Sequence, residues 1–105
     1  MAQFDVYRNP SAASSKHYPF LVDIQSRYIE ELTTRIVIPL GKVSLFNDTT
    51  MKRLTPVISF QDEKLVALTP QISSISKHQL KDPIGTLSHL REELVDALDF
   101  AIFGI

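Results

Sequence analysis

The sequence predicts a small, mainly β domain with one α-helix at its C-terminal end. From residue 3 to about residue 80, apolar residues occur in short β-branched runs separated by polar residues, which is typical of antiparallel strands. After Asp82 and Pro83 the apolar period changes from two to 3.6, which indicates a helix. A chain of 105 residues with 44% hydrophobic content can bury one core. We therefore expect one domain over residues 1–105, with a barrel over about 1–81 and a helix over about 86–103.

Alternation and β-branched composition predict the individual strands. The polar group 61–64 separates two apolar runs and indicates a hairpin. Pro39 follows a run that looks covered on both faces, and it predicts a sheet edge or a bulge because proline lacks a backbone donor. So many short strands in so small a domain favour a closed or nearly closed barrel. Strands are expected at residues 4–7, 20–24, 36–38, 56–60, 65–68 and 71–75.

Two connections are polar and predicted to be mobile, namely residues 9–16 and residues 47–53, the second ending in the basic pair Lys52 and Arg53. Either connection could be a contact site. Each is equally compatible with a solvated loop that has no partner.

The predicted helix presents an aromatic side chain on its charged face. On a helical wheel Phe103 points away from the apolar stripe and lies with Glu92, Asp96 and Asp99. An exposed aromatic in such a place indicates a contact site, unless the last turn frays and the ring folds back onto the barrel. The residues of the apolar stripe are Leu87, Leu90, Leu94, Ala97, Leu98, Ala101 and Ile105.

The end of the helix is also acidic, with four carboxylates and one guanidinium over residues 91–105. We expect the acids in the final turns to oppose the helix dipole. The acidic stretch as a whole is expected to form a surface complementary to a basic partner, whose arginines could contact the carboxylates and the Phe103 ring. A solvated outer face is the simpler interpretation for any single acid. Gly104 is expected to end the helix in a left-handed conformation, or to form a projecting hook with Phe103 and Ile105.

Composition argues against several classes of function. The chain has no cysteine, which excludes disulfides, thiolate metal sites and a thiol nucleophile, and which fits a reducing cytosol. The formal net charge of −1 offers no broad basic surface, so this chain alone is not expected to bind nucleic acid. No apolar run is long enough to span a bilayer and no export signal is present, so a cytoplasmic location is expected.

Catalytic signatures are equally scarce. The three histidines, His17, His78 and His89, lack metal-site spacing, and the three glycines form no phosphate-binding loop, so we expect no metal, no cofactor and no enzymatic activity. One alternative stays open at this point. Asp23, Thr34 and Arg35 could meet on a barrel face and act on RNA by acid–base and electrostatic means, although their spacing neither supports nor excludes this.

Several blocks of the sequence resemble the CcdB family, the toxins of plasmid and chromosomal toxin–antitoxin modules. The resemblance extends over nearly the whole chain, with length changes needed only in the loop of residues 9–16. The Val-Asp-Ile-Gln-Ser and Val-Ile-Pro-Leu blocks are specific in combination. The matching segments are residues 3–4, 6–7, 22–26, 35–40, 87–89 and 104–105.

The resemblance implies an SH3-like barrel with a C-terminal helix that forms a symmetric homodimer. It also implies poisoning of DNA gyrase through the A subunit, neutralisation by a CcdA-like antitoxin, and contact with operator DNA only through the antitoxin complex. The expected gyrase-binding residues are Phe103, Gly104, Ile105, Asp99, Ile29 and Tyr28.

One departure from the family pattern bears on potency. The best-known member has tryptophan where this chain has Phe103, so we expect gyrase binding to be weaker by about 1–2 kcal/mol. Two other functions remain compatible with the sequence. One is an endoribonuclease like the MazF and Kid toxins, which share this fold, and the other is a homologue that mainly binds antitoxin.

Overall fold

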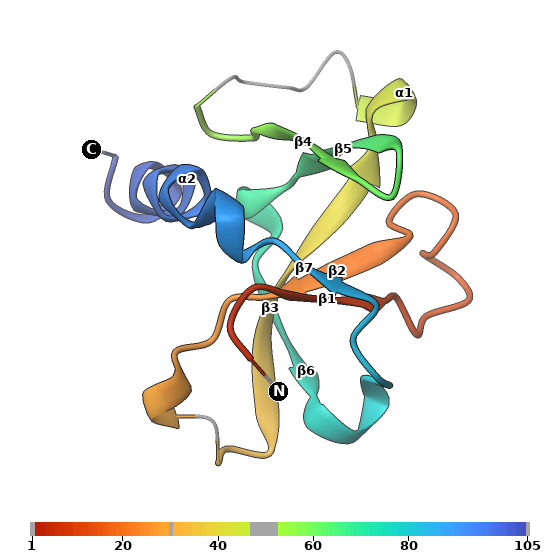
Figure 1. Cartoon of the computed structure of the whole chain (residues 1–105), viewed down its shortest axis with the longest axis vertical. Helices are drawn as coiled ribbons and strands as arrows, with labels where there is room; N and C mark the ends of the chain where they lie inside the picture. Colours follow the sequence, from red (N-terminus) through yellow and green to blue (C-terminus); the bar gives the residue numbers. More distant parts are fainter. Residues whose placement is uncertain (1, 30, 47–52, 105) are drawn as a thin grey trace.

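The β-branched runs form one curled antiparallel sheet of seven strands, shown in Figure 1. The computed structural model describes residues 2–29, 31–46 and 53–104. The strand order is β4-β5-β3-β2-β1-β7, and β6 pairs with the remaining part of β3. The strands are β1 (Asp5–Arg8), β2 (Phe20–Asp23), β3 (Thr34–Lys42), β4 (Val57–Phe60), β5 (Glu63–Ala67), β6 (Ser73–Ser76) and β7 (Gly85–Thr86).

The central strand β3 contains Pro39, so the predicted edge or bulge is wrong. Pro39 lies opposite Leu21 of β2, and its carbonyl accepts a hydrogen bond from Leu68 N on the other side. On that other side, β6 pairs with residues 34–37 of β3 and β5 pairs with residues 40–42. The backbone nitrogen of Pro39, which carries no hydrogen, therefore faces the gap between β6 and β5. No strand there needs a hydrogen-bond donor from Pro39.

The concave face of the sheet holds the main core. The rings of Phe20 and Phe60 meet edge to face with centroids 5.4 Å apart. Phe60 also packs over Gly85, where an added Cβ would lie 2.6 Å from the ring. In the described residues no strand pairing joins β4 to β7, so this side-chain contact draws the two ends of the half-barrel together. The fold class is confirmed as a mainly β, barrel-like domain with a C-terminal helix.

The helix α2 (Arg91–Phe103) begins later than expected, after the 3-10 turn η5 (Ser88–Leu90), and β7 extends the sheet beyond residue 81. Leu94 and Ala97 are buried against the core, which confirms the predicted apolar face. Because the helix starts at Arg91, Glu92 and Glu93 lie in its first turn. Acids in the first turn are favoured by the helix dipole, so the predicted opposition concerns only the acids of the later turns.

Short helical turns connect the strands. They are η1 (Arg27–Ile29), α1 (Val43–Phe46), η3 (Thr69–Gln71) and η4 (Lys77–Gln79). The predicted hairpin between β4 and β5 is present with a two-residue loop, Gln61 and Asp62, both at positive φ. Within the loop of residues 9–16, the Asn9 side chain donates to Ser14 Oγ and to Tyr18 O. The predicted mobile connection 47–53 lies, except for Arg53, outside the described residues.

No helix in the described part of the chain is both long and apolar enough to cross a membrane.

Candidate functional site

The C-terminal end of α2 exposes a cluster of apolar side chains. Phe103 is 69% exposed and Ile102 is 58% exposed. The predicted outward direction of Phe103 is confirmed, and the alternative in which its ring folds back onto the barrel is wrong. Asp99 lies one turn before Phe103 on the same side of the helix, because residues four apart are neighbours on a helical surface. The cluster therefore combines an apolar tip with a carboxylate.

Gly104 ends the helix as predicted. It adopts a left-handed conformation with φ of 72°, and its N–H donates to Phe100 O at 3.0 Å. A Cβ added at this position would meet no atom within 4 Å. The chain itself therefore needs glycine here only for its backbone conformation. Ile105, the third member of the predicted hook, lies outside the described residues.

Arg53 contacts α2 in a way that the sequence did not predict. Its Nε and Nη2 atoms donate to the two carboxylate oxygens of Asp96, each at 3.1 Å. Its guanidinium also lies over the Phe100 ring, 4.8 Å from the centroid. Asp96 and Phe100 together thus hold one arginine by a bidentate ion pair and a cation–π contact. The contact joins residues 43 apart, so no local pattern could have revealed it.

The helix repeats this Asp–X–X–X–Phe spacing. Asp96 and Phe100 form the first pair, and Asp99 and Phe103 form the second, displaced by three residues and so by about 60° around the helix. Among the described residues, no side chain forms an ion pair with Asp99. The second pair therefore offers the same two groups on an open surface.

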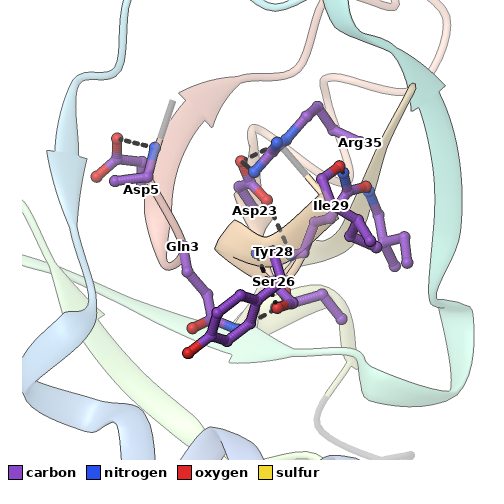
Figure 2. A network of polar contacts seen from close by, with 11 residues as sticks. Gln3, Asp5, Asp23, Ser26, Tyr28, Ile29 and Arg35 are labelled. Carbon is purple, nitrogen blue, oxygen red and sulfur yellow. Dashed lines mark hydrogen bonds and ion pairs between the residues drawn. The ribbon is translucent and has the colours of Figure 1, made fainter. Parts of the chain in front are cut away.

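The other predicted contact residues lie on the turn η1. Tyr28 is 85% exposed and Ile29 is 41% exposed. Gln25 holds this turn by donating its side-chain amide to Ile29 O at 2.7 Å, while Tyr28 N donates to Ser26 Oγ at 3.2 Å (Figure 2). In one chain the turn and the end of α2 occupy separate corners of the molecule (Figure 1). The structure brings together Asp99, Phe103 and Gly104, but not Tyr28 and Ile29 with them.

A second polar group lies on the outer face of the sheet. Arg35 Nε donates to Asp23 Oδ2 at 2.9 Å, and Arg35 Nη2 lies 2.6 Å from the same oxygen, as Figure 2 shows. The two side chains are only 1% and 0% exposed. Burial raises the pKa of Asp23, although hydrogen bonds from Gln25 N and Arg35 act to lower it.

This burial bears on the RNA-cleaving alternative. Asp23 and Arg35 do meet, but substrate cannot reach them, whereas Thr34 is exposed on the opposite face of β3. Nearby, burial raises the pKa of Tyr7 to about 12, with a further contribution from the charge of Asp5. The Tyr7 hydroxyl has no hydrogen-bond partner among the described residues. The pair Asp23–Arg35 therefore belongs to the interior and not to an accessible catalytic site.

Histidines and carboxylates do not gather into a metal site in the described ranges. His78 Nδ1 lies 2.9 Å from Ser76 Oγ.

A comparison with protein families identifies the family to which this chain belongs. Residues 3–104 match the model of the family described as CcdB protein. The match includes the curled sheet, the η1 turn, and α2 through the Gly104 cap. The chain therefore belongs to the CcdB family and is a toxin of the CcdA/CcdB type of toxin–antitoxin module.

Proposed function

We propose that this toxin poisons DNA gyrase by binding its A subunit with the end of α2 and by stabilising the complex in which the DNA is cleaved. The observation that carries the proposal is the exposed phenyl ring of Phe103 next to the carboxylate of Asp99. A monomeric protein gains nothing from a large apolar ring in water, so this position favours a protein contact.

A contact of the same chemical kind already exists within the chain. Arg53 is held by a carboxylate and a phenyl ring at the same spacing on the same helix. An arginine of the gyrase A subunit could make the corresponding contacts with Asp99 and Phe103. A cation–π contact contributes about 0.5–1 kcal/mol at an exposed site and about 2 kcal/mol or more when binding removes water. Phe103, Asp99 and Gly104, with Ile105 beyond the described residues, form the proposed core of the interface.

The homodimer is part of the same proposal. Tyr28 and Ile29 are exposed but lie apart from α2 within one chain (Figure 1). A single gyrase-binding surface that includes them requires a second copy, whose η1 turn would lie near the α2 end of its partner. A symmetric dimer is the usual way in which a small protein completes such a surface.

The proposal also assigns the remaining partners. A CcdA-like antitoxin would neutralise the toxin, and the complex would reach operator DNA through the antitoxin. The formal net charge of −1 supports this division of roles, because the composition gives no overall excess of positive charge for phosphate contacts.

The test is accumulation of cleaved DNA with purified gyrase, ATP, supercoiled plasmid and the full-length toxin. We expect linear DNA to accumulate with the wild-type chain and not with Phe103→Ala, since truncating a central aromatic anchor costs about 2–4 kcal/mol of binding. Leu45→Ala is the matched control, because it removes a half-exposed apolar side chain from α1 and not from α2. The fold of both variants is checked by their thermal unfolding midpoints.

Two results would defeat the proposal. One is the absence of cleaved DNA at saturating toxin together with no binding to the A subunit, and the other is full activity of Phe103→Ala. Antitoxin binding without any effect on gyrase would identify a protein that acts mainly by sequestering antitoxin. Cleavage of a bulk RNA substrate would identify the endoribonuclease alternative.

A further inference from the structure

The turn η1 exposes Tyr28 and Ile29 but has no buried residue of its own. Every described residue from 27 to 34 is exposed, so packing against the core does not hold this part of the chain. A 3-10 helix of three residues also has little stability in isolation, because one turn forms too few hydrogen bonds to offset the loss of backbone freedom. A group outside the turn must therefore fix its conformation.

The buried side chain of Gln25 is that group. It is 1% exposed, and both ends of its amide are hydrogen-bonded. Nε2 donates to Ile29 O at 2.7 Å, and Oε1 accepts a hydrogen bond from Ile36 N at 3.0 Å. Ile36 belongs to β3, so the amide joins η1 directly to the central strand of the sheet. In the described part of the chain, no other hydrogen bond joins η1 to a buried side chain.

Gln25 is held in turn by the buried ion pair. Gln25 N donates to Asp23 Oδ1 at 2.9 Å, and Asp23 Oδ2 accepts a hydrogen bond from Arg35 Nε at 2.9 Å (Figure 2). A continuous path of polar contacts therefore leads from the ion pair through Gln25 to the carbonyl of Ile29. Hydrogen-bonded groups in a low-dielectric interior favour one arrangement, because a different one would leave a buried group unpaired. The network thus fixes where the exposed turn lies relative to the sheet.

We propose that Gln25 is a positioning residue for the partner-binding surface on η1, and that it acts through Tyr28 and Ile29 without touching the partner. The inference rests on the proposed function, since it takes these two exposed residues as contacts of the gyrase A subunit. A turn that is already fixed in the free protein loses less conformational freedom on binding than a mobile one. Loss of the Gln25 hydrogen bond should therefore weaken binding even though the contacting side chains are unchanged.

Gln25→Glu tests the proposal with a nearly isosteric change. The introduced carboxylate keeps an oxygen for Ile36 N but places its second oxygen, instead of a donor, against Ile29 O. At about pH 8 the nuclear magnetic resonance order parameter of the Ile29 amide should fall from about 0.85 in the free wild-type protein to below about 0.6 in the variant. Binding to the A subunit, measured by isothermal titration, should weaken about tenfold. An unchanged order parameter, or unchanged affinity, overturns the proposal.

Acid should rescue this variant. Burial favours the neutral form of the introduced carboxyl, and once protonated the group can again donate to Ile29 O. Affinity relative to wild type should therefore recover between about pH 8 and about pH 5.5, and wild type measured at each pH corrects for titration of Asp23. Gln25→Met removes both hydrogen bonds without adding a charge, so it should show the same loss of order and no recovery in acid. Recovery of both variants, or of neither, contradicts the assigned hydrogen bond.

Two further variants separate positioning from a general loss of structure. Gln3→Glu is the matched control, because Gln3 Nε2 also donates to a backbone carbonyl, that of Ile24 at 3.1 Å, but does not contact η1. Its affinity should stay within about threefold of wild type. In the background Tyr28→Ala/Ile29→Ala, adding Gln25→Glu should cause no further loss, since the side chains through which Gln25 acts are absent.

The outcomes distinguish this inference from the proposed function. An equal loss from Gln25→Glu in the presence and absence of the Tyr28 and Ile29 side chains, in a protein that binds the A subunit, overturns the positioning role alone. Failure of the wild-type chain to bind the A subunit at all defeats the proposed function, and the binding role of Gln25 with it.

Discussion

Arg35 and Asp23 meet inside the protein with 1% and 0% of their side chains exposed, whereas Arg53 and Asp96 meet on α2 with 50% and 53% exposed. The chemistry of the two ion pairs is the same, but their surroundings differ. The buried pair cannot lose one partner without leaving a charge in a place that water does not reach. The exposed pair contributes little to folding but shows which groups on α2 can hold an arginine.

This difference separates the part of the molecule that maintains the fold from the part that faces a partner. On the outer face of the sheet, charge is enclosed and its loss should affect stability. At the end of α2, charge and aromatic surface are exposed, and their loss should affect binding. Substitutions in the two regions can therefore test the assignment of each.

The largest effect is expected for Arg35→Met, which keeps most of the side-chain volume but leaves Asp23 unpaired. The free energy of unfolding should fall by about 3–5 kcal/mol at pH 8 in chemical denaturation at fixed protein concentration. The loss should be smaller at acidic pH, because burial already raises the pKa of Asp23 and the unpaired carboxyl can take a proton. A loss below about 1 kcal/mol at pH 8 would show that the buried pair is not structural.

Alkaline pH should destabilise the protein through Tyr7. The folded pKa is raised to about 12 from 10.0, so between these values the unfolded chain releases the proton while the folded chain keeps it. The neutral phenol contributes its full stabilisation below pH 10. As the pH rises to 12, the free energy of unfolding should fall by about 2–3 kcal/mol. The check is the difference in denaturation between wild type and Tyr7→Phe across this range. Parallel curves for the two proteins would contradict the prediction.

Phe103→Trp tests the role of the exposed aromatic ring in binding the gyrase A subunit. A larger ring with a stronger negative face should tighten binding of the gyrase A subunit by about 1–2 kcal/mol, which is about five- to thirty-fold. Isothermal titration of wild type and variant measures this directly. The side chain is exposed, so the thermal midpoint should not change. Weaker binding by the variant would mean that the partner's pocket is shaped for phenylalanine.

The smallest effect is expected for Arg53→Gln. The pair with Asp96 is half exposed, so its loss should lower the free energy of unfolding by less than about 1 kcal/mol and should reduce its dependence on salt. Binding of the A subunit should stay within about threefold of wild type. A fall of about 3 kcal/mol in the free energy of unfolding would show that Arg53 stabilises the fold to the extent expected of Arg35.

Local patterns predicted most of the elements. Short apolar runs identified the main strands and the β4–β5 hairpin, and the 3.6-residue period identified the buried face of α2. The helix pattern predicted the outward direction of Phe103 and the left-handed cap at Gly104, each beside one alternative, because both features depend on residues within one or two turns.

Long-range features could not be predicted in the same way. The contact of Arg53 with Asp96 and Phe100 depends on how a distant loop returns to the helix. The position of Pro39 within the central strand depends on where β6 ends and β5 begins. The burial of Tyr7 and of the Asp23–Arg35 pair depends on the segment that covers the outer face of the sheet. None of these arrangements leaves a periodic signal in the sequence.

The most direct test compares two isosteric changes on one helix, Asp99→Asn and Asp96→Asn, in equilibrium binding to the gyrase A subunit. Asp99→Asn should weaken binding about tenfold, since it removes the carboxylate next to the exposed ring, while Asp96→Asn should stay within about threefold because its carboxylate holds the chain's own Arg53. Equal affinities for the two variants, or a greater loss with Asp96→Asn, would contradict the assignment of Asp99 and Phe103 as the open arginine-binding pair.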